Sequence, residues 1–210
     1  LMFRGTFYRR FVLGEWAAAE GLVYDFFGPE LVQPVPESLD GPWYISCDYG
    51  TVNPTSMGLW GQKGGVWYRT AEFYYDSRKT GRQQTDGEYA DDLARLAGGR
   101  DIRGVVLDPS AASFREELIR RGWTVYRAEN EVLSGIQRTA ELLRAGQLVI
   151  CSPCEDAIRE FGLYRWDTAA TGDRVVKEHD HAMDDIRYFA VTVASRRSEG
   201  FFAGAVERSG

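Results

Sequence analysis

Three aspartates stand where a divalent metal ion could be held. Asp48 and Asp108 each follow an apolar run, at 44–47 and 104–107, and such runs are typical of buried strands that present the next side chain at their carboxyl end. Asp184 lies much later in the chain. Gathered carboxylates repel one another, and Mg²⁺ or Mn²⁺, which takes oxygen ligands and keeps positions for water and phosphate, relieves that repulsion. The pattern predicts metal-assisted hydrolysis of phosphodiester bonds.

The segment around the third aspartate leaves several assignments open. The last helix is expected to begin near Asp180, a good N-cap residue that is also close enough to join a metal shell. Asp184 and Asp185 follow His181 by three and four residues, so helical spacing lets both share a rim with that ring. Tyr188 falls on the same rim. A plain structural role is the alternative for the strand-end acids, because aspartate is a common turn former.

Composition indicates a folded, soluble chain. The 210 residues are 44% hydrophobic and 13% aromatic, which argues against disorder and favours one globular domain with an arm. The net charge of −6 is not that of a protein whose main surface is a basic nucleic-acid patch, although clustered arginines can still build a local phosphate track. The sequence shows neither a membrane span nor a signal peptide, which predicts an intracellular protein. The start at Leu1-Met2 suggests a piece of something longer.

The three cysteines give little support to a special site. An odd count, at Cys47, Cys151 and Cys154, argues against a secreted disulfide framework. The spacing of Cys151 and Cys154 matches half a zinc site or a redox motif, but a zinc ion would need further ligands and the chain offers only His179 and His181 as histidines. Ordinary thiols are the favoured interpretation.

The pattern of apolar runs and turn residues predicts one mixed α/β domain. Strands at 44–47, 56–62 and 66–75 follow one another closely, with glycines between the last two, so an antiparallel meander is expected. The later segments should be parallel strands joined by right-handed crossovers, with helices on both faces. We expect helices at 85–97, 113–121, 132–144, 153–161 and 180–196, strands at 104–107, 123–126 and 147–151, a hairpin or flap at 162–177, and domain limits at 1–40 (arm or linker), 41–198 (the domain) and 199–210 (a tail).

Basic residues near the predicted site suit contact with phosphates. Arg78, Lys79 and Arg82 lie in a polar loop that contains glycine, and Arg174 and Lys177 lie in the predicted flap beside the third acidic segment. Such loops position a nucleic-acid backbone without reading bases. For each residue alone, a solvated surface charge is the alternative interpretation.

Almost every segment resembles a known family, the nuclease domain of the large terminase subunit of tailed double-stranded DNA phages. No single motif is specific, but their order and spacing together are. The similar segments are the arm 7–16, the first acidic motif Cys47-Asp48-Tyr49-Gly50 with Asn53-Pro54-Thr55, the loop 80–89, the second motif Leu107-Asp108-Pro109-Ser110-Ala111, and the third motif Asp180-His181-Ala182-Met183-Asp184 with Ile186-Arg187-Tyr188.

The resemblance implies a ribonuclease H-like fold and a set of site residues. By position, Asp48, Asp108 and Asp184 would hold two Mg²⁺ or Mn²⁺ ions, with His181 as an auxiliary ligand or proton-handling group. The family usually has a small residue after the third acid, where this chain has Asp185, so the identity of the third ligand stays open between the two neighbours.

The resemblance also implies a biological role. It predicts a metal-dependent endonuclease that cuts concatemeric viral double-stranded DNA during genome packaging in the host cytoplasm, with the terminase small subunit and the portal as partners. The chain has no Gly-x-x-x-x-Gly-Lys-Ser/Thr loop, so no ATP site is expected here and the arm would lead from an upstream ATPase domain. The alternatives are another ribonuclease H-like nuclease, of resolvase or transposase type, and a non-catalytic module that docks on DNA or a portal. The isolated domain is expected to be a monomer.

Overall fold

The fold is seen in a computed structural model that describes residues 21–167, 169–170 and 173–195. The tail expected at 199–210 and the first half of the expected arm lie outside the described residues. Within the described ranges, no helix has the length and apolar character needed to span a membrane.

A mixed sheet of seven strands forms the centre of the molecule, in the order β1-β7-β4-β3-β2-β5-β6. Strands β2, β3 and β4 make the predicted antiparallel meander, while β5 and β6 run parallel to β2 and β7 runs parallel to β4. The expected fold class is therefore confirmed. The strands are β1 (Val32–Gln33), β2 (Trp43–Asp48), β3 (Thr55–Lys63), β4 (Val66–Tyr75), β5 (Ile102–Leu107), β6 (Val125–Arg127) and β7 (Leu148–Cys151).

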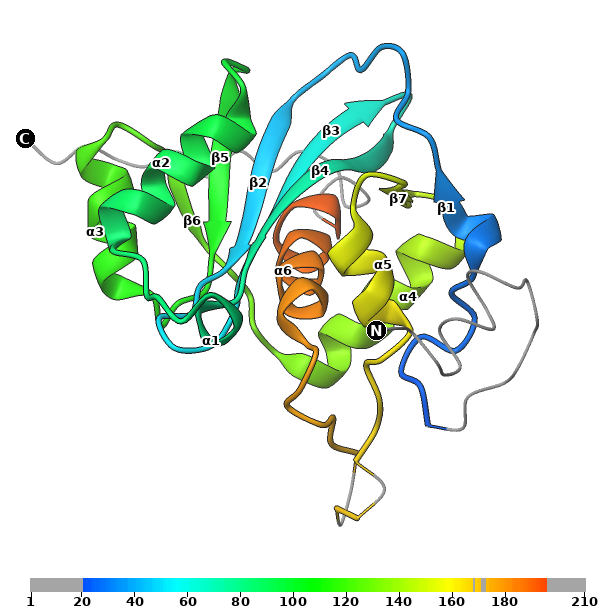
Figure 1. The fold of residues 1–210 in the computed structure, drawn as a ribbon. Coiled ribbons are helices and arrows are strands. Elements are labelled where there is room, and N and C mark those ends of the chain that lie inside the picture. Colours follow the sequence, from blue (N-terminus) through cyan, green and yellow to red (C-terminus); the bar gives the residue numbers. More distant parts are fainter. Residues whose placement is uncertain (1–20, 168, 171–172, 196–210) are drawn as a thin grey trace, which may run out of the picture.

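Helices cover both faces of the sheet, as Figure 1 shows: α2 and α3 lie on one side, and α4, α5 and α6 on the other. A capping box between Thr85 and Glu88 starts α2, and Gly98 in the left-handed region ends it, as the sequence predicts. The helices are α1 (Ser77–Thr80), α2 (Asp86–Ala97), α3 (Ala112–Arg120), α4 (Val132–Arg144), α5 (Glu155–Phe161) and α6 (His181–Phe189), the last followed by a π-helical turn (Ala190–Ala194).

Part of the expected arm belongs to the core. Tyr24 and Phe27 are buried, and the ring of Phe27 stacks on that of Phe161 with 3.8 Å between centroids. Strand β1 then adds a parallel edge to the sheet beside β7. The sequence analysis did not predict this strand, because two residues carry no periodic pattern.

The segment expected as a hairpin or flap shows antiparallel pairing. Trp166 bridges Val175, the amide of Asp167 donates to the carbonyl of Arg174 at 2.7 Å, and the amide of Val176 donates to the carbonyl of Arg165 at 3.0 Å. Residues 168, 171 and 172 of the predicted tip lie outside the described residues. This pairing ends at Val176, shortly before α6 begins at His181.

Helix α6 lies between the sheet and the helices α4 and α5, and it is buried from Ala182 to Phe189. The Phe189 ring stacks on Trp60 of β3 with 4.1 Å between centroids. The buried part of the helix nevertheless contains Asp184, Asp185 and Arg187, polar residues that the sequence alone would place on a solvated face. Two of them, Asp184 and Arg187, line the cavity described next.

Candidate metal centre

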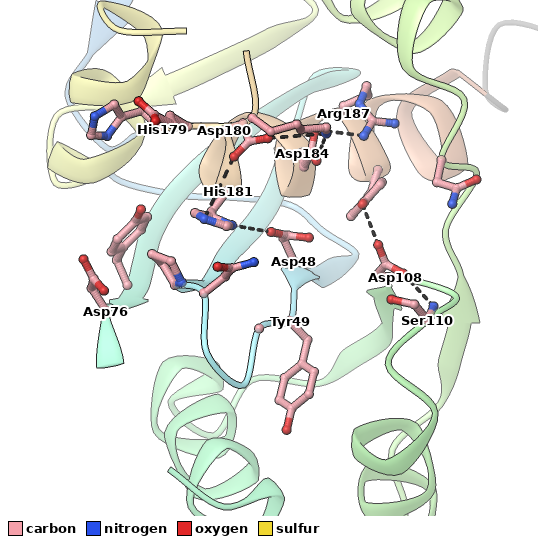
Figure 2. Close-up of a pocket in the computed structure, with 18 of the residues that line it drawn as sticks. Asp48, Tyr49, Asp76, Asp108, Ser110, His179, Asp180, His181, Asp184 and Arg187 are labelled. Atoms are coloured by element: carbon pink, nitrogen blue, oxygen red, sulfur yellow. Dashed lines mark hydrogen bonds and ion pairs between the residues drawn. The ribbon is translucent and has the colours of Figure 1, made fainter. Parts of the chain in front are cut away.

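A cavity of about 680 Å³ opens where β2 and β5 end and α6 begins. Figure 2 shows Asp48, Asp108, Asp184 and His181 around it. Asp48 is the last residue of β2, Asp108 follows β5 directly, and the other two lie in the first turn of α6. Parallel β2 and β5 end at the same edge of the sheet, and α6 packs across both strands. The fold thus brings to one wall four residues that are spread over most of the sequence.

Asp48 is the most crowded of the carboxylates. Its Oδ2 lies 2.9 Å from Nδ1 of His181. Burial raises the pKa of Asp48 to about 7, and the charges of Asp184 and Asp108 act in the same direction, against the hydrogen bond with His181. A positive charge placed in the cavity would therefore stabilise the ionised form.

Asp108 is held from two sides. The amide of Ser110 donates to its Oδ1 at 2.6 Å, and the hydroxyl of Tyr188 donates to its Oδ2 at 2.7 Å. Burial acts to raise the pKa of Asp108, but the bonds from Ser110 and Tyr188, together with the charge of Arg187, bring it below the usual range. This carboxylate is ionised and oriented.

Asp184 is neutralised by two basic residues. Arg187, one turn later on α6, donates from Nη2 to Oδ1 at 2.8 Å, and Nζ of Lys177 lies 3.4 Å from Oδ2. The same ammonium lies 3.3 Å from Oδ2 of Asp180. Lys177, which the sequence analysis assigned to DNA contact, thus contacts two acids of the cavity in this structure.

Asp185 points in the opposite direction, into the sheet. Its side chain has 0% exposure and pairs with Arg69 of β4, which donates from Nη2 at 3.0 Å. Ser46 donates to Oδ1 at 2.8 Å, and Ser56 also donates to the carboxylate. The expectation that Asp185 shares a rim with His181 and Asp184 is wrong, because buried donors of three strands satisfy its charge.

The start of α6 is capped from another helix. Asp180 occupies the N-cap position as expected, but among the described residues its side chain makes no capping bond. Instead Oε2 of Glu160, in α5, accepts from the amide of Ala182 at 2.7 Å, while Tyr74 donates to Oε1 at 2.6 Å. Glu160 was not predicted, because its partners lie far from it in sequence.

The predicted DNA-contacting residues divide into two groups. Arg78 and Lys79, in α1, line the cavity together with Lys177; Arg78 bonds the side chain of Asn53, and Lys79 lies 3.7 Å from Asp76. The other two lie elsewhere. Arg82 pairs with Glu88 of α2, and Arg174 is exposed in the hairpin.

Arg187 and Tyr188 also lie at the cavity wall; the sequence analysis gave Arg187 no role of its own and placed Tyr188 on the rim shared with His181. Arg187 is almost fully buried, and besides Asp184 it donates to the carbonyl of Glu131 at 3.2 Å. Gly135 of α4 makes room for it, since a Cβ there would lie 2.7 Å from Cδ of Arg187. Tyr188 supports Asp108 as described above. The spacing of Arg187 three residues after Asp184 was the available sign in the sequence.

The donor types of the cavity suit a hard divalent cation. Asp48, Asp108 and Asp184 offer carboxylate oxygens, the ligands that Mg²⁺ and Mn²⁺ take, and His181 offers a nitrogen. In the described part of the chain, however, no three His, Cys, Asp or Glu side chains are placed to hold one ion together. Lys177 and Arg187 neutralise the carboxylates in this arrangement.

None of the three cysteines lines the cavity. Cys47, Cys151 and Cys154, all within the described residues, are buried free thiols. The thiol of Cys154 donates to the carbonyl of Arg69 at 3.2 Å. Burial raises the pKa of all three.

The chain matches no known family profile and no curated protein sequence. Among solved structures, the large terminase of a thermophilic bacteriophage, in complex with ADP, shares 42% identity, covers 91% of this chain and 49% of its own, and has a TM-score of 0.80. The chain thus spans about half the length of that relative.

Two separately solved nuclease domains share the fold at low identity. The P22 large terminase nuclease domain is 18% identical over 86% of this chain and 95% of its own, with a TM-score of 0.68. The large terminase nuclease of thermophilic phage G20c with bound magnesium is 16% identical over 82% and 97%, with a TM-score of 0.61, and the same nuclease has been solved with cobalt. This chain therefore belongs to the large terminase family of phages, and it has the fold of their separately solved nuclease domains.

Proposed function

We propose that the domain is a metal-dependent endonuclease that cleaves double-stranded DNA by two-metal hydrolysis. The observation that carries the proposal is the convergence of Asp48, Asp108 and Asp184, from β2, β5 and α6, on one cavity. The magnesium and cobalt bound by the G20c nuclease support a divalent ion in this chain as well. Mg²⁺ or Mn²⁺ is the proposed cofactor.

A divalent ion in such a site supplies an activated water and offsets the charge of the departing oxygen. Asp48 would be the shared ligand, since β2 lies inside the sheet between β3 and β5. Asp108 and Asp184 would complete the acidic set, with His181 as auxiliary ligand or proton carrier. The residues around them do the positioning: Tyr188 and Ser110 hold Asp108, and the ring of His181 holds Asp48.

Among the acids next to the third motif, we propose Asp184 as the ligand. It lines the cavity, whereas Asp185 is bonded on both oxygens inside the sheet. Asp180 also lines the cavity, where it pairs with Lys177, and it would belong to the outer shell of the metal. Phosphates of the substrate would lie over Arg78, Lys79 and Lys177, with Arg82 and Arg174 farther along the DNA backbone.

The role of the whole protein extends this proposal. The chain would be the nuclease half of a terminase that cuts concatemeric viral DNA in the host cytoplasm, with an ATPase domain on the N-terminal side of the arm. The small subunit and the portal would be its partners. The relationship to the 42% identical large terminase, which was solved with ADP, supports an ATP-using half outside this chain.

Cleavage of supercoiled plasmid tests the proposal directly. The wild-type chain should nick and linearise DNA with Mn²⁺ or Mg²⁺ and stop in EDTA, and Asp48→Ala and Asp184→Ala should both be inactive. Asp91→Ala is the matched control, because that acid is exposed on α2 and pairs with Arg121. Activity that survives Asp184→Ala would rule out the proposed third ligand.

Calorimetric titration with Mn²⁺ distinguishes a metal-dependent nuclease from a non-catalytic docking module. Binding in the wild type that is lost in Asp48→Ala supports the metal centre. DNA binding without Mn²⁺ binding or cleavage would instead favour a non-catalytic module, in which Lys177 and Arg187 permanently neutralise the acids. Cleavage confined to branched DNA would favour a resolvase-type nuclease.

A further inference from the structure

Beneath the cavity lies a buried ion pair that the proposed reaction does not use. Arg69 of β4 and Asp185 of α6 both have 0% side-chain exposure. They are 116 residues apart in sequence, and both terminal nitrogens of the guanidinium donate to the carboxylate. A buried pair of this kind is weak support for stability, because taking two charges out of water is expensive. Nε of Arg69 adds to that expense, since it is buried without a hydrogen-bond partner among the described residues.

The sheet forms a directional socket for this one carboxylate. Oδ1 of Asp185 accepts from Ser46 of β2 and from Arg69, and Oδ2 accepts from Ser56 of β3 and from Arg69 again. Ser46 is itself oriented by Trp60, whose Nε1 donates to its hydroxyl at 2.8 Å. Three adjacent strands thus supply donors that meet at a single side chain.

Glycine on β3 makes the socket possible. A Cβ at Gly58 would overlap the guanidinium of Arg69, so the side chain of Arg69 can cross β3 only because this position has none. The pairing register places Gly58 opposite Ser46 on β2 and Glu72 on β4. The path from Arg69 to α6 is therefore built into the middle of the sheet.

The same guanidinium connects to the neighbouring helix. Nη2 of Arg69 lies 3.4 Å from Oε2 of Glu72, and Glu72 accepts from the amides of Asp156 and Ala157 at the start of α5, at 2.6 and 3.2 Å. Helix α5 in turn caps α6 through Glu160. Arg69 thus links the sheet to the starts of both helices that border the cavity.

The direction of Asp185 determines the direction of its neighbours. Successive residues of a helix differ by about 100° around its axis, so a fixed Asp185 also fixes Asp184 and His181. Apolar packing of α6, through residues such as Phe189, stabilises the helix but is not directional. Hydrogen bonds are directional. The pair is therefore a directional contact that can set the rotation of α6 from inside the sheet.

We propose that Asp185 and Arg69 are positioning residues for the metal centre: their ion pair fixes the rotation of α6, so that Asp184 faces the cavity and His181 faces Asp48. The inference rests on the proposed function and adds to it a role for two residues outside the ligand set. Loss of the pair should then weaken metal binding and slow cleavage by more than its effect on folding explains.

Two variants test this role in different ways. Asp185→Asn keeps the size of the side chain and can still accept from Ser46, but it loses the ionic attraction to Arg69, whose buried charge then depends on Glu72, 3.4 Å away. The double variant Arg69→Met with Asp185→Leu replaces the pair by apolar groups, a change that is often neutral or stabilising. Leu118→Ala is the matched control, because it removes buried volume from α3 on the opposite face of the sheet.

The measurements are Tm, Kd for Mn²⁺ by calorimetry, and kcat for plasmid nicking at saturating Mn²⁺, all well below the Tm of each variant. We expect both pair variants to be folded, with Kd raised about 10- to 100-fold and kcat lowered, as for other groups that orient ligands. Leu118→Ala should lower Tm yet keep the Kd and kcat of the wild type.

Three results would overturn the inference. One is a wild-type Kd and kcat in both folded pair variants. Another is an equal loss of Mn²⁺ affinity in Leu118→Ala, which would trace the effect to stability. The third is failure of both pair variants to fold by circular dichroism. A wild-type chain that neither binds Mn²⁺ nor cuts DNA would overturn the proposed function together with this inference, whereas the three results above leave the proposed function intact.

Discussion

Nδ1 of His181 lies 2.9 Å from Oδ2 of Asp48, although the two residues are 133 positions apart in the sequence. The contact joins the end of β2 to the first residue of α6. It fixes one oxygen of Asp48 and leaves the carboxylate at the cavity wall, which is how an outer partner orients a metal-binding group.

Removing the His181 ring should therefore slow DNA cleavage without abolishing it. We expect His181→Ala to lower the nicking rate about 10- to 100-fold, because Asp48 loses its orienting partner, and we expect Asp48→Ala to be more severe. Rates on supercoiled plasmid at saturating Mn²⁺ provide the measurement. The matched control is His179→Asn: His179 is exposed, has a φ of 55° that asparagine tolerates, and points away from Asp48 in Figure 2. Equal rates in both variants would contradict the role of His181.

Basic residues on the cavity wall should contribute more to DNA binding than those outside it. In an Asp48→Ala background, which keeps the DNA intact, we expect Lys79→Ala to weaken binding and to reduce the slope of log K against log salt concentration by about 0.9, the value for one phosphate contact. Arg82→Ala should have a smaller effect, because that guanidinium is paired with Glu88. Fluorescence anisotropy over a salt series measures both slopes, and a larger change for Arg82 would reverse the assignment.

The three thiols should be unreactive in the folded protein. Burial raises the pKa of Cys151 to about 11, and it raises the pKa of Cys47 and Cys154 as well, so little nucleophilic thiolate exists at about pH 8. We expect Ellman's reagent to label none of them until guanidinium unfolds the chain, after which all three should react. Rapid labelling of Cys151 or Cys154 in the native state, or zinc that copurifies with the chain, would revive the redox or zinc interpretation of this pair.

Stability should depend on pH through Glu160. Burial raises the pKa of this carboxyl above its usual value, against the hydrogen bonds from Tyr74 and the amide of Ala182. A raised pKa contributes stability that is complete below the unfolded pKa, about 4.3, and is lost as pH rises through the folded pKa. Glutamine at this position cannot ionise. As pH rises from the unfolded pKa through the folded pKa, the free energy of unfolding of Glu160→Gln should therefore increase relative to that of the wild type.

Urea unfolding at several pH values measures the difference for Glu160. Glu116→Gln serves as the control, because Glu116 has a 72% exposed side chain on α3, and it should follow the wild type across the series. A constant difference between Glu160→Gln and the wild type would show that Glu160 ionises alike in the folded and unfolded states.

The strands and most helices were predictable because their signals are local. The meander of β2, β3 and β4 matches the expected strands to within one residue at each end, since apolar runs and the turn at 64–65 mark them, and α4 matches at 132–144. Asp48 and Asp108 could be placed for the same reason, because a strand end is visible in the sequence.

The roles of Asp184 and Asp185 could not be assigned by the same logic. Asp184 follows His181 by three residues and Asp185 follows it by four, and on a helix both spacings bring a side chain near His181. The choice depends on Arg69, which is 116 residues from Asp185, and on the serines of β2 and β3. Asp180 failed as a side-chain cap for a related reason, because Glu160 of a different helix takes that place. Polar contacts between residues far apart in the chain leave no periodic pattern in the sequence.

Helix α6 occupies the centre of the sheet face although it is the last α-helix of the described chain, and this has a consequence for biosynthesis. A ribosome that has reached β7 has already made the strands bearing two of the acids, but the third acid and the cover over Trp60 arrive only with α6. A chain that ends before α6 would therefore have an open apolar sheet and would lack Asp184, the third of the proposed metal ligands. Under the proposed function, such a fragment should not cut DNA.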